Sequence, residues 1–165
     1  MRILIADDHG IVRQGLRSLI EANSEMEVIG EAADGCKAVA MATELLPDII
    51  IMDITMPKLN GIEATRQIVQ EKLLTKVIAL SMHSDKQFVS RMFKAGAVGY
   101  LLKDCAVDEL AEAIRTVIRD QAYIGKTISS VVLDDYVQQL RRPPEVDEGD
   151  LTPREREFLK RASRR

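Results

Sequence analysis

The stretch DIIIMDITMPKLNG, from Asp48 to Gly61, decides the fold class of this chain. It opens with an unbroken apolar run, Ile49 to Met52, that has the length of a strand. Continuous runs of Ile, Val and Leu are typical of strands that are buried on both faces of a parallel sheet. The run stops at Asp53, so a carboxylate stands at the end of the expected strand. Gly61 permits a tight turn or a close backbone approach after it.

The same kind of apolar run recurs on both sides of this stretch. The other runs cover residues 3–6, 28–32, 77–80 and 98–102, and amphipathic segments lie near 11–22, 36–46, 60–72, 85–95 and 107–119. Five strands alternating with five helices predict an α/β fold, with a five-stranded, parallel, doubly wound sheet of the flavodoxin-like kind and helices on both faces. Ligands of such sheets bind at the carboxyl ends of the strands.

The pattern changes after residue 120. Residues 126–141 carry an apolar stripe at helical spacing, so we expect a linker helix there, followed by an extended linker. Further on, Thr152 is a good N-cap, Pro153 suits the first helical position and Glu155 completes a capping box. We therefore predict three regions: a domain at 1–120, a linker at 121–150 and the start of an all-α domain at 151–165.

The charges divide the chain at a similar place. Residues 151–165 carry a net charge of +4, which leaves −7 on residues 1–150 because the whole chain carries −3. An acidic body with a basic tail fits a tail that faces a polyanion. A solvated terminal helix with an excess of arginine explains the same charges, so charge alone does not establish nucleic-acid binding.

The composition limits the class of protein. With 165 residues, of which 46% are hydrophobic, the chain can form one ordinary domain with a short appendage. Cys36 and Cys105 share no metal-ligand spacing, and we expect two reduced thiols rather than a disulfide. The N-terminal MRILIADDHG fits neither a signal peptide nor a membrane span. We therefore expect a soluble, cytoplasmic protein.

Polar side chains follow four of the five expected strands. Asp7 and Asp8 follow the first strand, Asp53 ends the third, Ser81 ends the fourth and Lys103 follows the fifth. Because the carboxyl ends of parallel strands meet at one edge, we expect these side chains to lie together. Three clustered carboxylates repel one another unless a cation is present, and Mg²⁺ prefers oxygen ligands. A carboxylate can also attack phosphorus to give an aspartyl phosphate.

These features resemble the receiver domain of bacterial response regulators over about residues 1–120. The matching stretches are the pair Asp7–Asp8, the run Asp48–Gly61, the ALS of 79–81 and the AGAVGYLLKD of 95–104. An acidic pair, a later D-x-x-M-P-x-x-x-G after an apolar strand and a following lysine form a highly specific combination. The resemblance implies a phosphorelay protein that takes a phosphoryl group from a sensor histidine kinase.

The resemblance also implies a role for each acid. Asp53 is the expected phosphoacceptor. Asp8 and Asp53 are expected to hold Mg²⁺ by their side chains, with Asp7 contributing through a water molecule and Thr55 through its backbone carbonyl. The site that the resemblance implies is therefore a Mg²⁺-dependent phosphorylation site at the edge of the sheet.

The resemblance further identifies the residues that respond to phosphorylation. Ser81 matches the switch hydroxyl, Tyr100 the switch aromatic and Lys103 the lysine that contacts the phosphoryl group. Many receivers have a cis proline after this lysine, where this chain has Asp104. Because a cis bond without proline costs about 3 kcal/mol, we expect a trans bond or a strained loop here.

The C-terminal residues resemble a second domain. LTPREREFLKRA, from residue 151 to 162, is similar to the start of the helix-turn-helix domain in the NarL/FixJ (LuxR-type) subfamily. The DDH of residues 7–9 and the MHSD of 82–85 fit that subfamily too. The recognition helix that enters the major groove does not follow, so we expect a truncated DNA-binding domain. The implied partners are a second copy of the chain on phosphorylation, and DNA in the full-length protein.

We therefore interpret the chain as a response regulator of a two-component phosphorelay that regulates transcription through dimerisation and DNA binding. We expect no enzyme activity beyond intrinsic autodephosphorylation. A receiver that acts only by protein contact is the alternative, because the DNA-binding domain is incomplete. The first helix, the fifth helix and the 126–141 segment are the candidate dimer faces.

Two other functions that share this architecture fit the sequence less well. A phosphatase with an aspartyl intermediate usually has a second acid two residues after the nucleophile, where this chain has Thr55. A flavin phosphate would be repelled by the acidic site in the absence of a metal. The histidines His9 and His83 have no His or Cys partner at ligand spacing, so we expect them on the surface or behind the ligands.

Overall fold

The computed structural model describes residues 1–71 and 73–141. The chain divides into two compact units, Met1–Leu133 and Asp134–Arg165. The strands are β1 (Arg2–Ala6), β2 (Glu27–Ala32), β3 (Ile49–Asp53), β4 (Lys76–Ser81), β5 (Gly99–Leu102) and β6 (Tyr123–Ile124). The helices are α1 (Gly10–Glu21), α2 (Gly35–Leu45), α3 (Gly61–Gln70), α4 (Lys86–Ala95), α5 (Ala106–Ile118) and α6 (Lys126–Arg141), with a short 3-10 turn, η1 (Lys103–Cys105).

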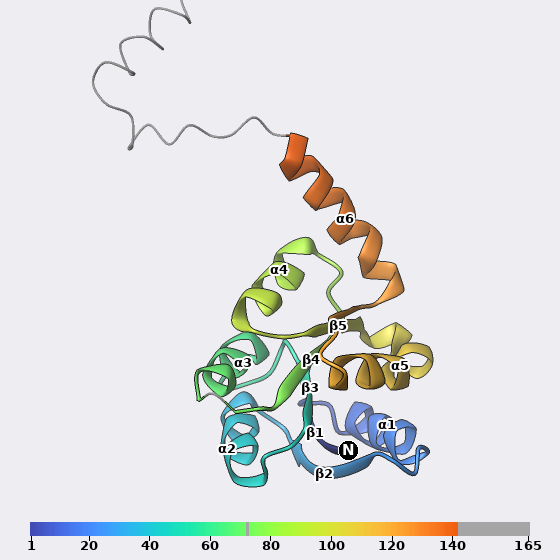
Figure 1. The fold of residues 1–165 in the computed structure, drawn as a ribbon. Coiled ribbons are helices and arrows are strands. Elements are labelled where there is room, and N and C mark those ends of the chain that lie inside the picture. Colours follow the sequence, from blue (N-terminus) through green and yellow to red (C-terminus); the bar gives the residue numbers. More distant parts are fainter. Residues whose placement is uncertain (72, 142–165) are drawn as a thin grey trace, which may run out of the picture. The chain divides into compact units, whose positions relative to one another are not determined.

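The strands of the described residues form one parallel sheet in the order β2-β1-β3-β4-β5-β6 (Figure 1). The predicted α/β class and the parallel, doubly wound arrangement are confirmed. The predicted number of five strands is wrong by one, because β6 pairs with Gly99 and Tyr100 of β5. A strand of two residues leaves no apolar run that a sequence pattern can reveal.

The winding of the chain reverses at β1. From β1 the chain moves to β2 on one side, and β3, β4 and β5 follow on the other side. In sheets of this kind ligands bind in the crevice outside the carboxyl ends of the two strands that flank such a reversal. Asp7 and Asp8 follow β1 directly, and Asp53 is the last residue of β3. The fold therefore brings three carboxylates to its ligand-binding edge.

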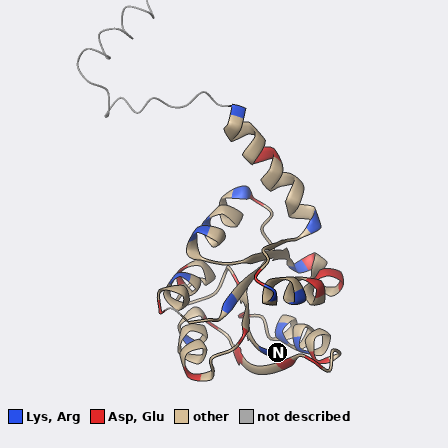
Figure 2. Ribbon diagram, in the orientation of Figure 1, with Lys and Arg blue, Asp and Glu red and all other residues tan. Residues whose placement is uncertain are grey.

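The apolar core lies on both faces of the sheet. Helices α1 and α5 cover one face and α2, α3 and α4 cover the other (Figure 1). Along β1, Ile3 and Ile5 pack on the face that α1 and α5 cover, and Leu4 and Ala6 pack on the face that α2, α3 and α4 cover. Charged residues lie mainly on the helices and near the strand ends (Figure 2). The rigid apolar centre thus fixes the positions of the polar strand ends.

Gly61, which closes the stretch that decides the fold, lies against the backbone of Asp53. A Cβ atom at this position would sit 1.9 Å from the carbonyl oxygen of Asp53. The N–H of Gly61 donates to the carbonyl of Ile54, at 2.8 Å. The expected close backbone approach is therefore confirmed, and it holds the loop after Asp53 tightly against the end of β3.

The predicted helix over 126–141 is confirmed as α6, and its first turns belong to the first unit. Ile128 is fully buried in the core of that unit. The N–H of Gly125 donates to the carbonyl of Tyr100 at 2.8 Å, which joins the start of α6 to β5. The first unit therefore continues beyond residue 120, through β6 and into α6.

A buried carboxylate fastens this junction from the side of α5. Glu109 is only 5% exposed. One of its oxygens, Oε2, accepts a hydrogen bond from the Tyr123 hydroxyl at 2.9 Å and another from the backbone N–H of Lys126 at 3.0 Å. Burial and the Glu109 carboxylate raise the pKa of Tyr123, so its hydroxyl remains a donor. Glu109 thus connects α5 to both β6 and the first residue of α6.

The extended linker and the start of a second domain, predicted for residues 142–165, lie outside the described residues. None of the helices within 1–71 and 73–141 is long and apolar enough to cross a membrane. Cys36 and Cys105 are free thiols, as the sequence predicted.

Candidate functional site

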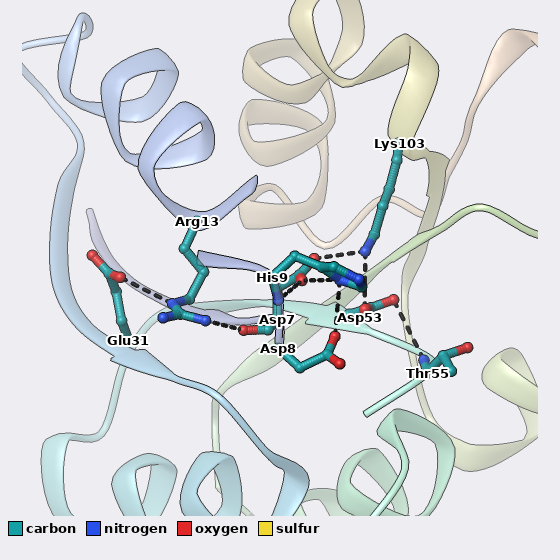
Figure 3. A network of polar contacts seen from close by, with 8 residues as sticks. All are labelled: Asp7, Asp8, His9, Arg13, Glu31, Asp53, Thr55 and Lys103. Atoms are coloured by element: carbon teal, nitrogen blue, oxygen red, sulfur yellow. Dashed lines mark hydrogen bonds and ion pairs between the residues drawn. The ribbon is translucent and has the colours of Figure 1, made fainter. Parts of the chain in front are cut away.

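The candidate site lies where β1 and β3 end side by side (Figure 3). Asp53 is 3% exposed and Asp7 is 1% exposed, whereas Asp8 is partly open to solvent. Oxygen and nitrogen atoms of Asp7, Asp8, His9 and Asp53 lie within 4.8 Å of one another. The three predicted carboxylates therefore converge, and a histidine joins them.

Lys103 supplies the positive charge of the site. It begins η1, directly after β5, and its side chain reaches across to the acids (Figure 3). Its Nζ atom lies 2.9 Å from Oδ2 of Asp53 and 2.7 Å from Oδ2 of Asp7. Burial alone would lower the pKa of Lys103, but the two carboxylates more than offset this and raise it. Lys103 is therefore a permanently charged cation between two buried acids.

The carboxyl group of Asp53 is destabilised in its charged form. Burial raises its pKa, the hydrogen bond from Lys103 lowers it, and the charge of Asp7 raises it further, with a net rise. Its other oxygen, Oδ1, accepts a long hydrogen bond of 3.4 Å from the backbone N–H of Thr55. The charge of one lysine and one long hydrogen bond from an amide thus do not offset the negative charge of this group of acids.

Asp7 retains an oxygen without a hydrogen bond. Its Oδ1 accepts from the backbone N–H of His9 at 2.8 Å. Its Oδ2 is buried and accepts no hydrogen bond of good geometry, although the charged Nζ of Lys103 is near enough to count as an ion pair. A buried carboxylate oxygen of this kind is unusual, and a water molecule or a cation would satisfy it. The set of carboxylate oxygens fits a hard divalent cation such as Mg²⁺.

A second ion pair holds the backbone of Asp7 in place. Nη1 of Arg13, on α1, donates to the carbonyl oxygen of Asp7 at 2.6 Å, and Nε of Arg13 donates to Glu31 of β2 at 3.1 Å. Arg17 also donates to Glu31, at 2.7 Å, and this bond lowers the pKa of Glu31. The position of Asp7 is therefore fixed from behind by residues of α1 and β2, which the sequence analysis did not identify.

The predicted switch residues lie on the next two strands of the sheet, Ser81 on β4 and Tyr100 on β5. Ser81 is fully buried at the end of β4, and its Oγ accepts from the backbone N–H of His83 at 2.9 Å. Tyr100 is also fully buried, and its hydroxyl donates to the carbonyl of His83 at 2.7 Å. Burial raises the pKa of Tyr100, which keeps it a donor. The aromatic ring of Tyr100 is thus inside the protein, held through His83.

The sequence also made predictions for Asp104 and for the two histidines, His9 and His83. Asp104 is exposed, and no cis peptide bond occurs in the described residues, so the trans alternative expected after Lys103 is the one observed. His83 stacks on Phe88 with ring centroids 4.3 Å apart, and its Nε2 lies 3.4 Å from Oγ1 of Thr55. The expectation of a peripheral role fits His83 better than it fits His9, whose ring contacts the acids directly.

Comparison with known proteins identifies the family. The model of the response regulator receiver domain matches residues 3–115. The transcriptional regulatory protein LiaR of Bacillus subtilis is 40% identical over 161 residues, which cover 96% of this chain and 74% of LiaR. The crystal structure of a LuxR-family two-component response regulator from Aurantimonas has a TM-score of 0.79 and 38% identity, over 82% of this chain and 97% of that one.

A solved structure of lower sequence identity also matches this chain. A complex from Borrelia burgdorferi that contains CheX, CheY, BeF₃⁻ and Mg²⁺ matches with a TM-score of 0.67 and 27% identity, over 71% of this chain and 88% of that one. LiaR and DegU of Brevibacillus brevis are both named transcriptional regulatory proteins. The chain belongs to the response regulator receiver family and is a two-component response regulator of the LuxR/NarL type.

Proposed function

We propose that Asp53 is the residue that accepts the phosphoryl group, from a phosphohistidine of a sensor histidine kinase. The observation that carries this proposal is the position of its carboxylate: buried at the carboxyl end of the strand beside β1, 2.9 Å from Lys103 and within the cluster of Asp7 and Asp8. A nucleophile at this point is rigidly held, and phosphoryl transfer depends mainly on positioning and on neutralisation of charge.

The transfer conserves atoms and charge in a simple way. A carboxylate oxygen of Asp53 forms a bond to phosphorus while the bond from phosphorus to the histidine nitrogen breaks, and the imidazole leaves and takes up a proton. Lys103 then exchanges its contact with the Asp53 carboxylate for a contact with a phosphoryl oxygen. Its raised pKa keeps it charged during this exchange.

The fit of the acids to a hard cation supports Mg²⁺ as the cofactor. Asp8 and Asp53 would hold it by their side chains, Asp7 through a water molecule and Thr55 through its backbone carbonyl. When bound, Mg²⁺ supplies charge neutralisation at the phosphoryl oxygens. The related CheX–CheY complex contains both Mg²⁺ and BeF₃⁻, and BeF₃⁻ serves as a phosphomimetic in a solved structure of the RcsB receiver.

The contacts of Ser81 and Tyr100 suggest how phosphorylation is sensed. The Ser81 hydroxyl can turn from the His83 N–H towards a phosphoryl oxygen, and Tyr100 holds the carbonyl of the same His83 from inside. In the structure Tyr100 already occupies the inward position that we expect after phosphorylation. Phosphorylation would therefore stabilise this arrangement relative to one with Tyr100 outside, as a shift between two populations.

The expected output is dimerisation and DNA binding. LiaR and DegU are named transcriptional regulatory proteins, and this chain matches them over nearly all of its length. Regulation of transcription by DNA binding would place the protein in the cytoplasm. Hydrolysis of the phosphoaspartate by the protein's own site would end the signal. A receiver that never binds DNA would instead act by protein contact alone.

The test is phosphorylation by acetyl phosphate, in which acetate is the leaving group. We expect a mass gain of about 80 Da, one phosphoryl group, that requires Mg²⁺ and disappears in Asp53→Asn. Asp104→Asn is the matched control, because Asp104 is an exposed acid beside Lys103 at the same edge, and it should be phosphorylated normally. An undiminished mass gain in a folded Asp53→Asn variant would contradict the proposal.

A further inference from the structure

His9 occupies a capping position without acting as a cap. It is the residue before the first turn of α1, yet its side chain makes no cap hydrogen bond. Ser, Thr, Asp and Asn are favoured at such positions because their oxygens accept from the free N–H groups of the first turn. Capping of α1 therefore does not explain why a histidine stands at this position.

The imidazole of His9 turns towards the acids instead. Its Nδ1 lies 3.2 Å from Oδ1 of Asp7 and 3.0 Å from Oδ1 of Asp8 (Figure 3). The same nitrogen, or its partner in the ring, shares the 4.8 Å cluster with a carboxylate oxygen of Asp53. One nitrogen donor thus stands among three oxygen donors, on consecutive residues that a buried strand and α1 hold in place.

We propose that Nδ1 of His9 is a metal ligand, so that this site binds a divalent transition metal such as Ni²⁺, Co²⁺ or Zn²⁺ in preference to Mg²⁺. The inference rests on the proposed metal site and goes beyond it in naming a further ligand and a class of metal. The expected set of protein donors is one imidazole nitrogen with carboxylate oxygens of Asp7, Asp8 and Asp53.

The spacing of the donors agrees with shared coordination. Two ligand atoms that each lie about 2.1 Å from one ion, at a right angle, are about 3.0 Å apart. The observed separations of 3.0 and 3.2 Å between Nδ1 of His9 and the two carboxylate oxygens match this value. The donors therefore need little movement to surround an ion.

An independent observation also points to an ion. Oδ2 of Asp7 is buried without a hydrogen bond of good geometry, beside Nζ of Lys103 at 2.7 Å, and Oδ1 of the same carboxylate lies 3.2 Å from Nδ1 of His9. Three clustered carboxylates favour any divalent cation, but imidazole favours Ni²⁺, Zn²⁺ and Cu²⁺ over Mg²⁺. His9 therefore adds affinity for transition metals and almost none for Mg²⁺.

Selective binding would give the site a second input. A transition metal bound by His9 would also bind the carboxylates that would hold Mg²⁺, including that of Asp53. Because two ions cannot share these ligands, each ion should displace the other in competition. The phosphorylation site would then respond to the transition-metal concentration as well as to the kinase.

The experiment is calorimetric titration of the untagged full chain with NiCl₂ and, separately, with MgCl₂. We expect His9→Gln to lose at least about tenfold in Ni²⁺ affinity while its Mg²⁺ affinity stays within about twofold of the wild type. His83→Gln is the matched control, since His83 is the other histidine of the chain and lies outside the cluster, and it should leave both affinities unchanged. His9→Ala serves as a second variant, and circular dichroism verifies folding.

The outcomes separate this inference from the proposed function. Unchanged Ni²⁺ affinity in both His9 variants would overturn the role of His9 while Mg²⁺ binding still supports the phosphorylation site. An equal loss for Ni²⁺ and Mg²⁺, or an equal loss in His83→Gln, would overturn it too. If the wild type binds no Mg²⁺ at all, the proposed phosphorylation site itself is wrong.

Discussion

Two buried carboxylates of this protein sit in opposite situations. Oε2 of Glu109 receives hydrogen bonds from two neutral donors of the same unit, the Tyr123 hydroxyl and the Lys126 N–H. Asp53 faces a second buried acid, Asp7, and shares a single lysine with it. The pKa of Asp53 is raised chiefly by burial.

This difference separates a structural carboxylate from a reactive one. Where the fold supplies two close hydrogen-bond donors to one acid, as at Glu109, the acid fastens elements together. Where the fold supplies too little positive charge, the acid is poised to take a cation or to form a bond to phosphorus. The comparison predicts that removal of the two acids changes the free energy of unfolding with opposite signs.

The largest effect is expected at Glu109. Glu109→Ala leaves the Tyr123 hydroxyl and the Lys126 N–H without their acceptor, and we expect a loss of about 2–3 kcal/mol in the free energy of unfolding, measured with urea. Glu112→Ala is the matched control, because Glu112 is exposed on the same helix and makes only a 3.4 Å contact with Tyr123. If the two variants are equally stable, Glu109 is not a fastening residue.

A smaller effect is expected at Tyr123. Tyr123→Phe keeps the ring of a residue that is 9% exposed and removes only the hydroxyl that donates to Glu109. A hydrogen bond to a charged acceptor contributes about 1.5 kcal/mol, so we expect a loss of this size. Combined with Glu109→Ala, the second substitution should cost almost nothing more, because the shared bond is already gone. If the losses in the free energy of unfolding caused by the two substitutions simply add, the two residues do not stabilise the protein through a shared hydrogen bond.

The smallest effect, of opposite sign, is expected at Asp53. Asp53→Asn removes a charge that the site disfavours, so at pH 7 without Mg²⁺ we expect a gain of about 1 kcal/mol in the free energy of unfolding. Because the pKa of Asp53 is raised in the folded protein, its contribution to stability is full below the unfolded value of about 4 and declines as pH rises through the folded value.

The advantage of the Asp53→Asn variant should therefore grow as pH rises above the unfolded pKa of about 4, and it should level off above the folded pKa of Asp53. Parallel urea titrations of the wild type and the variant at several pH values measure this difference directly. Asp104→Asn is again the control and should show no such growth, since Asp104 is exposed. A variant that is less stable than the wild type at pH 7 would mean that Lys103 compensates Asp53 fully.

The sequence predicted those parts of the fold that unbroken apolar runs and helical periodicity specify. The run before Asp53 became β3, and the segment over 126–141 became α6. The strand β6 was missed because its two residues make sense only beside β5. The burial of Glu109 was missed for the same reason: on α5 alone a glutamate looks solvated, but Tyr123 of β6 and Lys126 of α6 donate hydrogen bonds to it.

The candidate site, like the fold, was predicted from the sequence only in part. Asp7, Asp8, Asp53 and Lys103 could be placed together because strand ends of a parallel sheet share one edge. His9 was set aside because ligand spacing was sought between histidines and cysteines. The signal that could have found it is three ligating side chains in a row, DDH, directly after a buried strand.

The most direct test of the central claim is to locate the phosphoryl group chemically. After reaction with acetyl phosphate and Mg²⁺, borohydride reduction converts a phosphorylated aspartate to homoserine, and peptide sequencing by mass spectrometry finds its position. We expect homoserine at position 53 and at none of the other acids of the edge. Homoserine at position 7, 8 or 104 in place of 53 would contradict the assignment of Asp53 as the phosphoacceptor.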